Sequence, residues 1–376
     1  MKIYLFITIT VATINLHAKV LDTTWKSIIP DNENSWSKTA KAEEIEESAF
    51  LIRPEKSSEW ESKIKSKKTK NPQDEYNVVV AQDGSGDFVS IQDAIYASKS
   101  FPYQRVIIKI KNGIYKEKVH VYSWNTKVSL IGESVENTII TFDDYFDKIN
   151  LGRNSTFHTA TVLVEGNDFI AKNLTIKNAS GPVGQAVALS VNANRAYFEN
   201  CKFYGFQDTL YTSGEDFKQY FKNCFIEGTT DFIFGEATVL FQDCVINSKS
   251  DSYVTAASTP QGVEFGYVFI DCNLTADDNV SEVYLGRPWR MYAKTVFVHC
   301  NMGEHIRPVG WHNWSNLEAE KNTFYAEFEN MGEGFKPKER VGWAHQLTKQ
   351  QAEKYTIKNI LGEYQETSKK EWYEKL

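Results

Sequence analysis

The stretches FENCKFYGFQDTL (Phe198–Leu210) and FKNCFIEGTTDFI (Phe221–Ile233) are two copies of one pattern in this chain of 376 residues. They are offset by 23 residues, and each has Asn-Cys near its start and an aspartate near its end. A repeat of roughly 20 to 30 residues made of short apolar runs is typical of a solenoid. Equivalent positions in neighbouring coils of a β-solenoid lie about 4.8 Å apart. The repeat therefore predicts that Asp208 and Asp231 lie side by side.

Two carboxylates this close cannot both ionise freely, so the pKa of one should rise. Such a pair suits an acid working beside a base or nucleophile. A single aspartate after a glycine more often caps a turn through its own side chain. Here each aspartate is followed by a strand-like run, Thr209–Tyr211 or Phe232–Phe234, which favours the functional interpretation.

The rest of the chain supports an all-β fold. From Arg105 to about Ala326, short β-branched and aromatic runs recur between polar turns, and no long helical pattern interrupts them. This favours a solenoid over alternating strand–helix units. We expect a short capping helix near Ser90–Ile95. The predicted organisation is a signal peptide (1–18), a charged N-terminal extension (19–75), a solenoid domain (76–346) and a helical tail packed on it (347–376).

Composition narrows the class of protein. Residues 1–18 hold one lysine and an apolar run, which is typical of a secretory signal peptide, so we expect a secreted protein without a membrane partner. Its removal leaves 41 basic against 49 acidic side chains, a net charge of −8 that disfavours a nucleic-acid partner. The five cysteines (201, 224, 244, 272 and 300) lack zinc-site spacing, so no metal site is expected. They indicate an inward-facing ladder of small residues.

Further polar residues should join the two aspartates. Gln185 precedes Gln207 by about one coil, and glutamine amides can donate to a developing oxyanion while an aspartate attacks. An inter-coil amide ladder is the alternative for each glutamine. Arg287 could keep one carboxylate ionised, because a fixed arginine lowers a neighbouring carboxylate's pKa. Trp289 should point to the same face as Arg287 and could stack on a sugar ring, or belong to the core.

With these residues the chain resembles the pectin methylesterase (pectinesterase) family from about Val78 to Trp343. The motifs that carry the resemblance are, in order, Asp83–Gly86, Gly113–Glu117, Gln185–Leu189, Gly205–Leu210, Asp231–Gly235, Leu285–Trp289 and Gly310–Trp314. Each motif alone is weak, but their order and spacing together are specific.

The resemblance implies a single-stranded right-handed parallel β-helix that hydrolyses galacturonate methyl esters of pectin without metal or cofactor. It implies that Asp231 is the nucleophile and Asp208 the acid and base. Gln185 and Gln207 would bind the oxyanion, and Arg287 would hold Asp231. Tyr211, Phe234 and Trp289 match sugar-binding positions, and Cys224 and Cys244 match a disulfide of many family members. We expect the protein to act on methyl-esterified pectin as a monomer.

Three rival functions share the fold. A glycoside hydrolase acting on polygalacturonate could use the same aspartate pair, although two glutamines favour acyl transfer. A pectate lyase would require calcium and a basic proton abstractor. A non-catalytic carbohydrate-binding β-solenoid would bind pectin without turnover.

Overall fold

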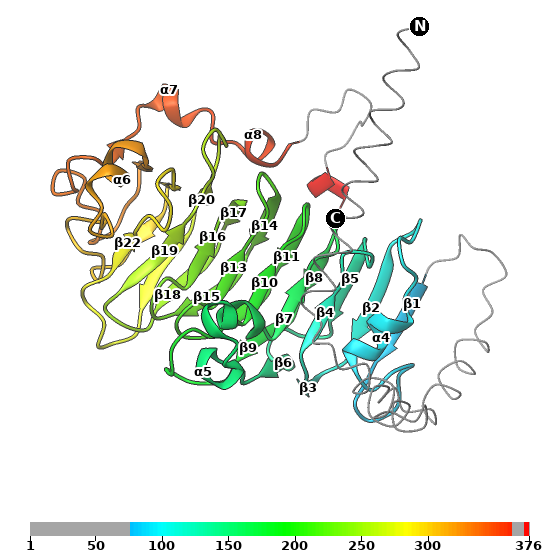
Figure 1. The fold of residues 1–376 in the computed structure, drawn as a ribbon. Coiled ribbons are helices and arrows are strands. Elements are labelled where there is room, and N and C mark those ends of the chain that lie inside the picture. Colours follow the sequence, from blue (N-terminus) through cyan, green and yellow to red (C-terminus); the bar gives the residue numbers. More distant parts are fainter. Residues whose placement is uncertain (1–75, 363–371, 376) are drawn as a thin grey trace, which may run out of the picture. The chain divides into compact units, whose positions relative to one another are not determined.

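The computed structural model describes residues 76–362 and 372–375, all within one compact unit, Thr69–Leu376. The predicted signal peptide, the N-terminal extension and part of the tail lie outside the described residues. Within this part of the chain, the strands form three parallel sheets, which confirms the predicted all-β solenoid. Figure 1 shows strands of successive coils lying side by side along the chain.

Sheet A contains eleven strands: β1 (Tyr76–Val80), β2 (Val106–Ile110), β5 (Val128–Gly132), β8 (Ile170–Lys172), β11 (Ala196–Glu199), β14 (Lys218–Lys222), β17 (Thr238–Gln242), β20 (Tyr267–Ile270), β23 (Lys294–Val298), β25 (Phe324–Phe328) and β26 (His345–Gln346). Sheet B contains eight: β3 (Gly113–Lys116), β6 (Thr138–Phe142), β9 (Thr175–Asn178), β12 (Lys202–Tyr204), β15 (Phe225–Gly228), β18 (Val245–Ser248), β21 (Asn273–Ala276) and β24 (Asn301–Met302). Sheet C contains seven: β4 (Val119–Val121), β7 (Val162–Val164), β10 (Leu189–Val191), β13 (Leu210–Thr212), β16 (Ile233–Gly235), β19 (Tyr253–Ala257) and β22 (Tyr284–Gly286).

Each complete coil contributes one strand to each sheet. The first copy of the repeat spans β11, β12 and the start of β13, and the second spans β14, β15 and the start of β16. Leu210 pairs with Ile233, so Asp208 and Asp231 occupy equivalent places two residues earlier. The 23-residue offset in the sequence is therefore one full coil.

The interior of the β-helix contains ladders of identical side chains. Phe198, Phe221, Phe241, Phe269 and Phe297 stack with ring centroids 4.4–5.2 Å apart, and all five are buried. Aromatic pairs in such contact stabilise a core by about 0.5–1.5 kcal/mol each beyond the burial of apolar area. The phenylalanine that begins each copy of the repeat is thus a core residue.

The residue before each cysteine forms a corner of the coil. Asn200, Asn223, Asp243, Asp271 and His299 all have φ between 51° and 55°. Among non-glycine residues, Asn, Asp and His adopt this left-handed conformation most readily. The Asn-Cys, Asp-Cys and His-Cys pairs therefore encode the corner between sheets A and B.

The cysteines form a ladder of free thiols, so the predicted disulfide between Cys224 and Cys244 is wrong for this structure. All five are buried, and each sulfur contacts backbone carbonyls of its own and the preceding coil. The Cys224 thiol donates to the carbonyls of Lys222 and Phe198, at 3.3 and 3.6 Å. The Cys244 thiol donates to those of Gln242 and Phe221, at 3.3 and 3.5 Å. Because every rung repeats this arrangement, nothing singles out one pair of rungs for a bridge.

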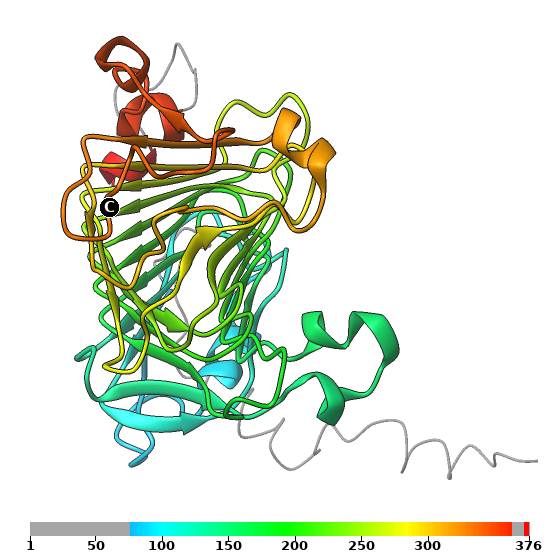
Figure 2. The same ribbon diagram turned by 90° about the vertical axis from the view of Figure 1, so that its left-hand side faces the viewer.

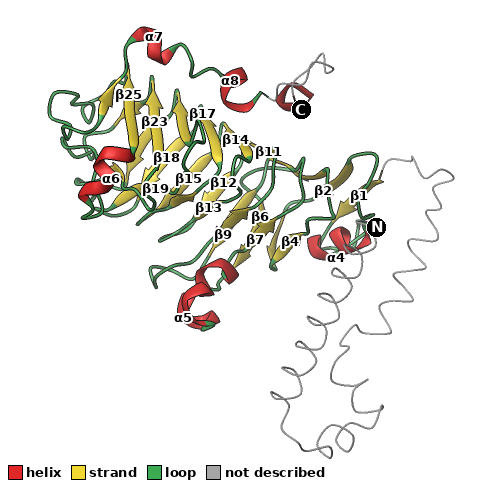
Figure 3. Cartoon of the chain, turned by 45° about the horizontal axis from the view of Figure 1, so that its top comes forward, coloured by secondary structure: helices red, strands yellow, loops and turns green. Residues whose placement is uncertain are grey.

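Short helices cap and flank the sheets (Figure 3). They are α4 (Ile91–Ala97), α5 (Phe146–Ile149), α6 (Leu317–Asn322), α7 (Lys349–Ala352) and α8 (Ile357–Leu361), with 3-10 turns η1 (Gly152–His158) and η2 (Trp372–Lys375). The Glu117 carboxylate accepts from the backbone amides of Ile91 and Gln92 and so caps α4. Ile360 and Leu361 of α8 are buried against the outer face of sheet A.

Candidate active site

The candidate catalytic residues lie in the turns that lead from sheet B into sheet C. Gln185 precedes β10, Gln207 and Asp208 precede β13, and Asp231 precedes β16. Gln185 and Gln207 form a parallel β-bridge, and the Ala186 amide donates to the Gln207 carbonyl. The structure thus brings together the four residues that the sequence placed on three consecutive coils.

Both aspartates have a left-handed backbone, with φ of 65° for Asp208 and 50° for Asp231. The glycine three residues earlier allows this turn to pack closely on itself. A Cβ atom on Gly228 would lie 2.2 Å from Phe232 Cβ and 2.6 Å from the Phe206 carbonyl. The repeated glycine is therefore required by close approach, and left-handed residues of this kind are enriched at functional sites.

Arg287, directly after β22, holds Asp231 with two hydrogen bonds. Its Nε donates to Asp231 Oδ1 at 2.9 Å and its Nη2 to Oδ2 at 2.6 Å. This bidentate geometry is the strong form of a charge-assisted hydrogen bond. Arg287 therefore contacts the carboxylate that the sequence analysis assigned to it.

Two aromatic rings enclose the Arg287 guanidinium. Its Cζ lies 3.9 Å from the centroid of Tyr253 and 3.7 Å from that of Trp314. Sequence reasoning missed this role for both residues. Trp314 belongs to the motif Gly310–Trp314, but nothing in the sequence indicated that it contacts Arg287. Tyr253 lies in none of the motifs. The sandwich restricts the guanidinium plane and so fixes the direction from which it meets Asp231.

The two carboxylates have different electrostatic surroundings. Burial and the nearby Asp231 raise the pKa of Asp208 well above its usual range, with only a partial offset from Arg287. Burial also raises the pKa of Asp231, whereas hydrogen bonding to Arg287 lowers it. The expected lowering by arginine is therefore present, but burial outweighs it. Proton sharing within the pair favours a protonated Asp208 beside an ionised Asp231.

An aromatic ledge borders this site on the outer face of sheet C. The rings of Tyr211 and Phe234 stack with centroids 4.8 Å apart, and Trp289 lies 5.9 Å from Phe234. Phe157 of η1 packs on Tyr211 at 5.1 Å. The three predicted sugar-contacting residues are thus contiguous, and Phe157 is an additional member that the sequence did not reveal.

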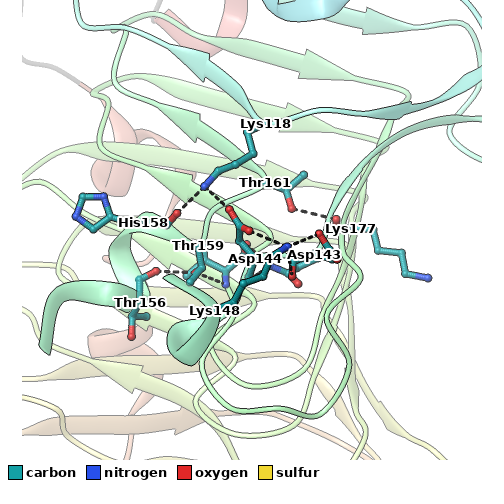
Figure 4. A network of polar contacts seen from close by, with 11 residues as sticks. Lys118, Asp143, Asp144, Lys148, Thr156, His158, Thr159, Thr161 and Lys177 are labelled. Atoms are coloured by element: carbon teal, nitrogen blue, oxygen red, sulfur yellow. Dashed lines mark hydrogen bonds and ion pairs between the residues drawn. The ribbon is translucent and has the colours of Figure 1, made fainter. Parts of the chain in front are cut away.

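The segment that carries Phe157 is braced by charged side chains (Figure 4). Asp144 Oδ2 accepts from Lys118 Nζ at 2.8 Å, and its Oδ1 lies 3.0 Å from Lys148 Nζ. Burial raises the pKa of Asp144, but these two lysines outweigh it, so the pKa lies below its usual value.

The same segment contacts the backbone of Gln185. The Phe146 amide donates to the Gln185 carbonyl at 2.9 Å, and the Asn178 side chain donates to the Asp144 carbonyl at 2.8 Å. In Figure 2 the α5–η1 segment stands out from the sheets. The Asp144 network therefore connects an outlying segment to the backbone of Gln185.

In residues 76–362 and 372–375, no group of three or more His, Cys, Asp or Glu side chains is arranged to hold a metal ion. Within the same described ranges, no helix is both long and apolar enough to cross a membrane.

A parallel β-helix with a buried aspartate pair, a bidentate arginine and a bordering aromatic ledge defines a β-helix hydrolase. The sequence profile of the Pectinesterase family matches residues 77–364. The chain belongs to the pectinesterase family and is a carboxylic ester hydrolase.

Individual relatives agree with this assignment. Pectinesterase 31 of Arabidopsis thaliana is 41% identical over 283 residues, which cover 73% of this chain and 89% of that protein. A second Arabidopsis relative, probable pectinesterase/pectinesterase inhibitor 23, is 40% identical, but this chain spans only about half (51%) of its length. The structure is also similar to pectin methylesterase from carrot, with a TM-score of 0.72 and 34% identity over 76% of this chain and 93% of that one.

A pectin methylesterase solved in complex with a hexasaccharide gives a TM-score of 0.66 at 28% identity, covering 78% of this chain and 99% of that chain.

Proposed function

We propose that this protein removes methyl esters from galacturonate units of pectin and releases methanol through an aspartyl acyl-enzyme. The observation that carries the proposal is the unequal pair: Asp231 is held bidentately by Arg287, whereas the pKa of Asp208 is raised well above its usual range. One carboxylate is thereby suited to attack and the other to donate a proton. The family assignment and the hexasaccharide-bound relative support pectin as the substrate.

In the first half-reaction, Asp231 Oδ attacks the ester carbonyl carbon and forms a new C–O bond. The carbonyl oxygen becomes an oxyanion, which accepts hydrogen bonds from the side-chain amides of Gln185 and Gln207. When the tetrahedral intermediate collapses, the methoxy group leaves with the proton of Asp208 as methanol. The galacturonyl group then remains on Asp231 as an anhydride.

In the second half-reaction, the ionised Asp208 takes a proton from water, and the resulting hydroxide attacks the galacturonyl carbon. The bond to Asp231 breaks, and Asp231 leaves as a carboxylate stabilised by Arg287. Asp208 is protonated again, which restores the starting state. The aromatic ledge of Tyr211, Phe234 and Trp289 would contact the sugar rings on either side of the ester.

Methanol release from methylated pectin, with and without a chelator, tests this function. We expect Asp231→Ala to abolish release and Asp208→Asn to leave a very slow enzyme that accumulates acyl-enzyme. Asp251→Asn, an exposed aspartate in the corresponding turn of the next coil, is the matched control and should retain activity. Near-parent activity of either catalytic variant would reject the assigned roles.

The rival functions give different products in the same assay. A glycoside hydrolase would release reducing ends without methanol, and a calcium-dependent lyase would lose activity with the chelator. A non-catalytic carbohydrate-binding solenoid would bind pectin without releasing anything.

We also propose that the protein is secreted and acts as a monomer without a cofactor. Pectin lies in the cell wall, so the enzyme must meet its substrate outside the cell that makes it. Recovery of active enzyme in the culture medium and its elution at the size of one chain would support both points. Retention inside the cell or elution as a dimer would reject them.

A further inference from the structure

A second aromatic cluster lies on sheet C, at the end opposite β22. His120 of β4 and the following residues Tyr122 and Trp124 are spaced two apart along the chain. The Tyr122 and Trp124 rings stack at 4.7 Å with an interplanar angle of 4°, and the His120 ring lies 3.7 Å from Tyr122. Tyr96 of α4 stacks on Tyr122 at 6.1 Å. We call these four residues the β4 platform.

The β4 platform is accessible and has polar edges. Trp124 is 44% exposed and Tyr96 56% exposed, so both retain open ring surface. The Tyr96 and Tyr122 hydroxyls lie 3.3 Å apart, and His120 Nε2 lies 2.7 Å from Glu165 Oε2. The hydrogen bond between Tyr122 and Tyr96, together with burial, raises the pKa of Tyr122 to about 12, so the Tyr122 hydroxyl keeps its proton. Flat apolar faces beside hydroxyl and imidazole groups suit a sugar ring better than an apolar side chain.

The backbone beneath the β4 platform is fixed before any ligand arrives. The Gln92 side chain of α4 accepts from the His120 amide at 2.6 Å and donates to the His120 carbonyl at 3.3 Å. The Trp124 carbonyl accepts from the Phe101 amide at 2.7 Å. Figure 3 shows α4 lying beside β4. A site that is already ordered loses less conformational entropy on binding.

The β4 platform and the aromatic ledge share one face of sheet C. Val119 and Val121 are buried, so His120 and Tyr122 point outward. Across the sheet, residues at the His120 position pair in the order His120, Leu163, Ser190, Tyr211, Phe234. From β16 to β4 there are four inter-strand steps of about 4.8 Å, or about 19 Å in all. A polymer that occupies the ledge is long enough to reach the platform.

We propose that the β4 platform is a distal subsite for the same pectin chain whose ester is hydrolysed beside Asp231. This inference rests on the proposed function and extends it to a second contact. The Glu165 carboxylate at the platform disfavours a free galacturonate anion. The ligand is therefore an uncharged, methyl-esterified galacturonate residue that stacks on Trp124.

A distal contact on one polymer acts by raising the effective concentration of the chain at the first site. It should affect only substrates that span both sites. Loss of one aromatic contact of about 0.5–1.5 kcal/mol corresponds to roughly a twofold to tenfold rise in KM. The chemical step at Asp231 should be untouched, so kcat should not change.

The test compares Trp124→Ala with the parent enzyme on two substrates, long highly methylated pectin and a methylated trigalacturonate too short to span both sites. We expect KM for the long substrate to rise twofold to tenfold, with kcat and the kinetics on the short substrate unchanged. Tyr103→Ala is the matched control, because Tyr103 is 82% exposed and lies outside the β4 platform. It should leave KM unchanged on both substrates.

Binding by affinity electrophoresis gives a second measurement that does not depend on turnover. In an Asp231→Ala background, which cannot form the acyl-enzyme, Trp124→Ala should reduce retardation in gels of highly methylated pectin but not in gels of de-esterified polygalacturonate. Equal KM values and equal retardation would overturn the proposal, as would equal losses on long and short substrates. If Trp124→Ala leaves KM unchanged but is cleaved faster by a protease within residues 19–75, the proposal is wrong and the occupant of the β4 platform is that segment of the chain. If the parent enzyme releases no methanol, the proposed function is wrong. Pectin binding at the β4 platform would still be tested by the retardation measurement, which does not require turnover.

Discussion

Replacement of Arg287 by lysine should shift the acidic limb of the pH–rate profile to higher pH. Arg287 makes two charge-assisted hydrogen bonds to Asp231, at 2.9 and 2.6 Å, and its side chain is 18% exposed. Lysine retains the positive charge but cannot make the bidentate fork, so about one bond is lost. A hydrogen bond to a charged group stabilises by about 1.5–3 kcal/mol. Since 1.36 kcal/mol equals one pKa unit, the pKa of Asp231 should rise by about one to two units.

The sign follows from the proposed role of Asp231 as the ionised nucleophile. Burial already raises its pKa, and Arg287 opposes that rise. Weakening Arg287 therefore leaves more of the enzyme protonated and inactive at a given acidic pH. The limb should move upward by about one to two pH units, and kcat/KM on the acidic side should fall about tenfold or more.

The assay is kcat/KM for methanol release across pH, because this quantity reports the ionisation of the free enzyme. Arg195→Lys is a matched control: Arg195 also forms a bidentate pair, with Asp168 at 2.6 and 3.1 Å, but at the entry to sheet A. This control should leave the acidic limb in place. If the pH profile of Arg287→Lys has the same acidic limb and the same kcat/KM as the parent enzyme, Arg287 does not set the ionisation of Asp231.

Three further predictions concern stability and local order. Arg340→Met should lower the free energy of unfolding by about 3–5 kcal/mol in urea, because it leaves the fully buried Glu327 unpaired; the exposed Lys321→Met should cost less than about 1 kcal/mol. Asp144→Asn should speed amide hydrogen exchange across residues 143–160 by roughly twofold to fivefold, whereas the exposed Asp147→Asn should not, and equal protection would show that the lysine network is dispensable. Asp208→Asn should raise Tm at neutral pH. The pKa of Asp208 is higher in the folded than in the unfolded state, so Asp208 destabilises the fold once the pH rises above its unfolded-state pKa. The increase in Tm should therefore vanish in acid, where the carboxyl is protonated in both states. A gain independent of pH would contradict that cause.

The register of the aspartate pair could be predicted because it obeys the period of the fold. Asp208 and Asp231 recur at the coil length, so the sequence alone placed them in register, and Gln185 and Gln207 followed from the same step. Arg287 could be predicted only from chemistry, as the charge that an ionised carboxylate requires. The corner residues before each cysteine could in principle have been recognised, since Asn, Asp and His share a tolerance of positive φ.

The remaining parts of the site depend on contacts between segments that share no period. Trp314 reaches Arg287 from the chain after β22, and Phe157 reaches Tyr211 from an insertion between β6 and β7. Such contacts are set by the paths of irregular loops, which leave no repeating signal in the sequence. The disulfide prediction failed for a related reason. Stacking brings Cys224 and Cys244 to equivalent positions, but the direction of each thiol is fixed by the carbonyls around it.

Coil stacking also explains why this fold can produce two unlike carboxylates from one repeated motif. Equivalent positions are forced to a spacing of about 4.8 Å, at which the second ionisation of a buried pair is always opposed by the first. The repeat thus couples the ionisation of the two carboxylates, and a single non-repeating residue decides which of them keeps the proton. Because Arg287 follows β22 and contacts only the Asp231 carboxylate bidentately, it breaks the symmetry of the two copies. Asp208 is left as the member that holds the proton, which supports the proposed attack by Asp231 and proton donation by Asp208.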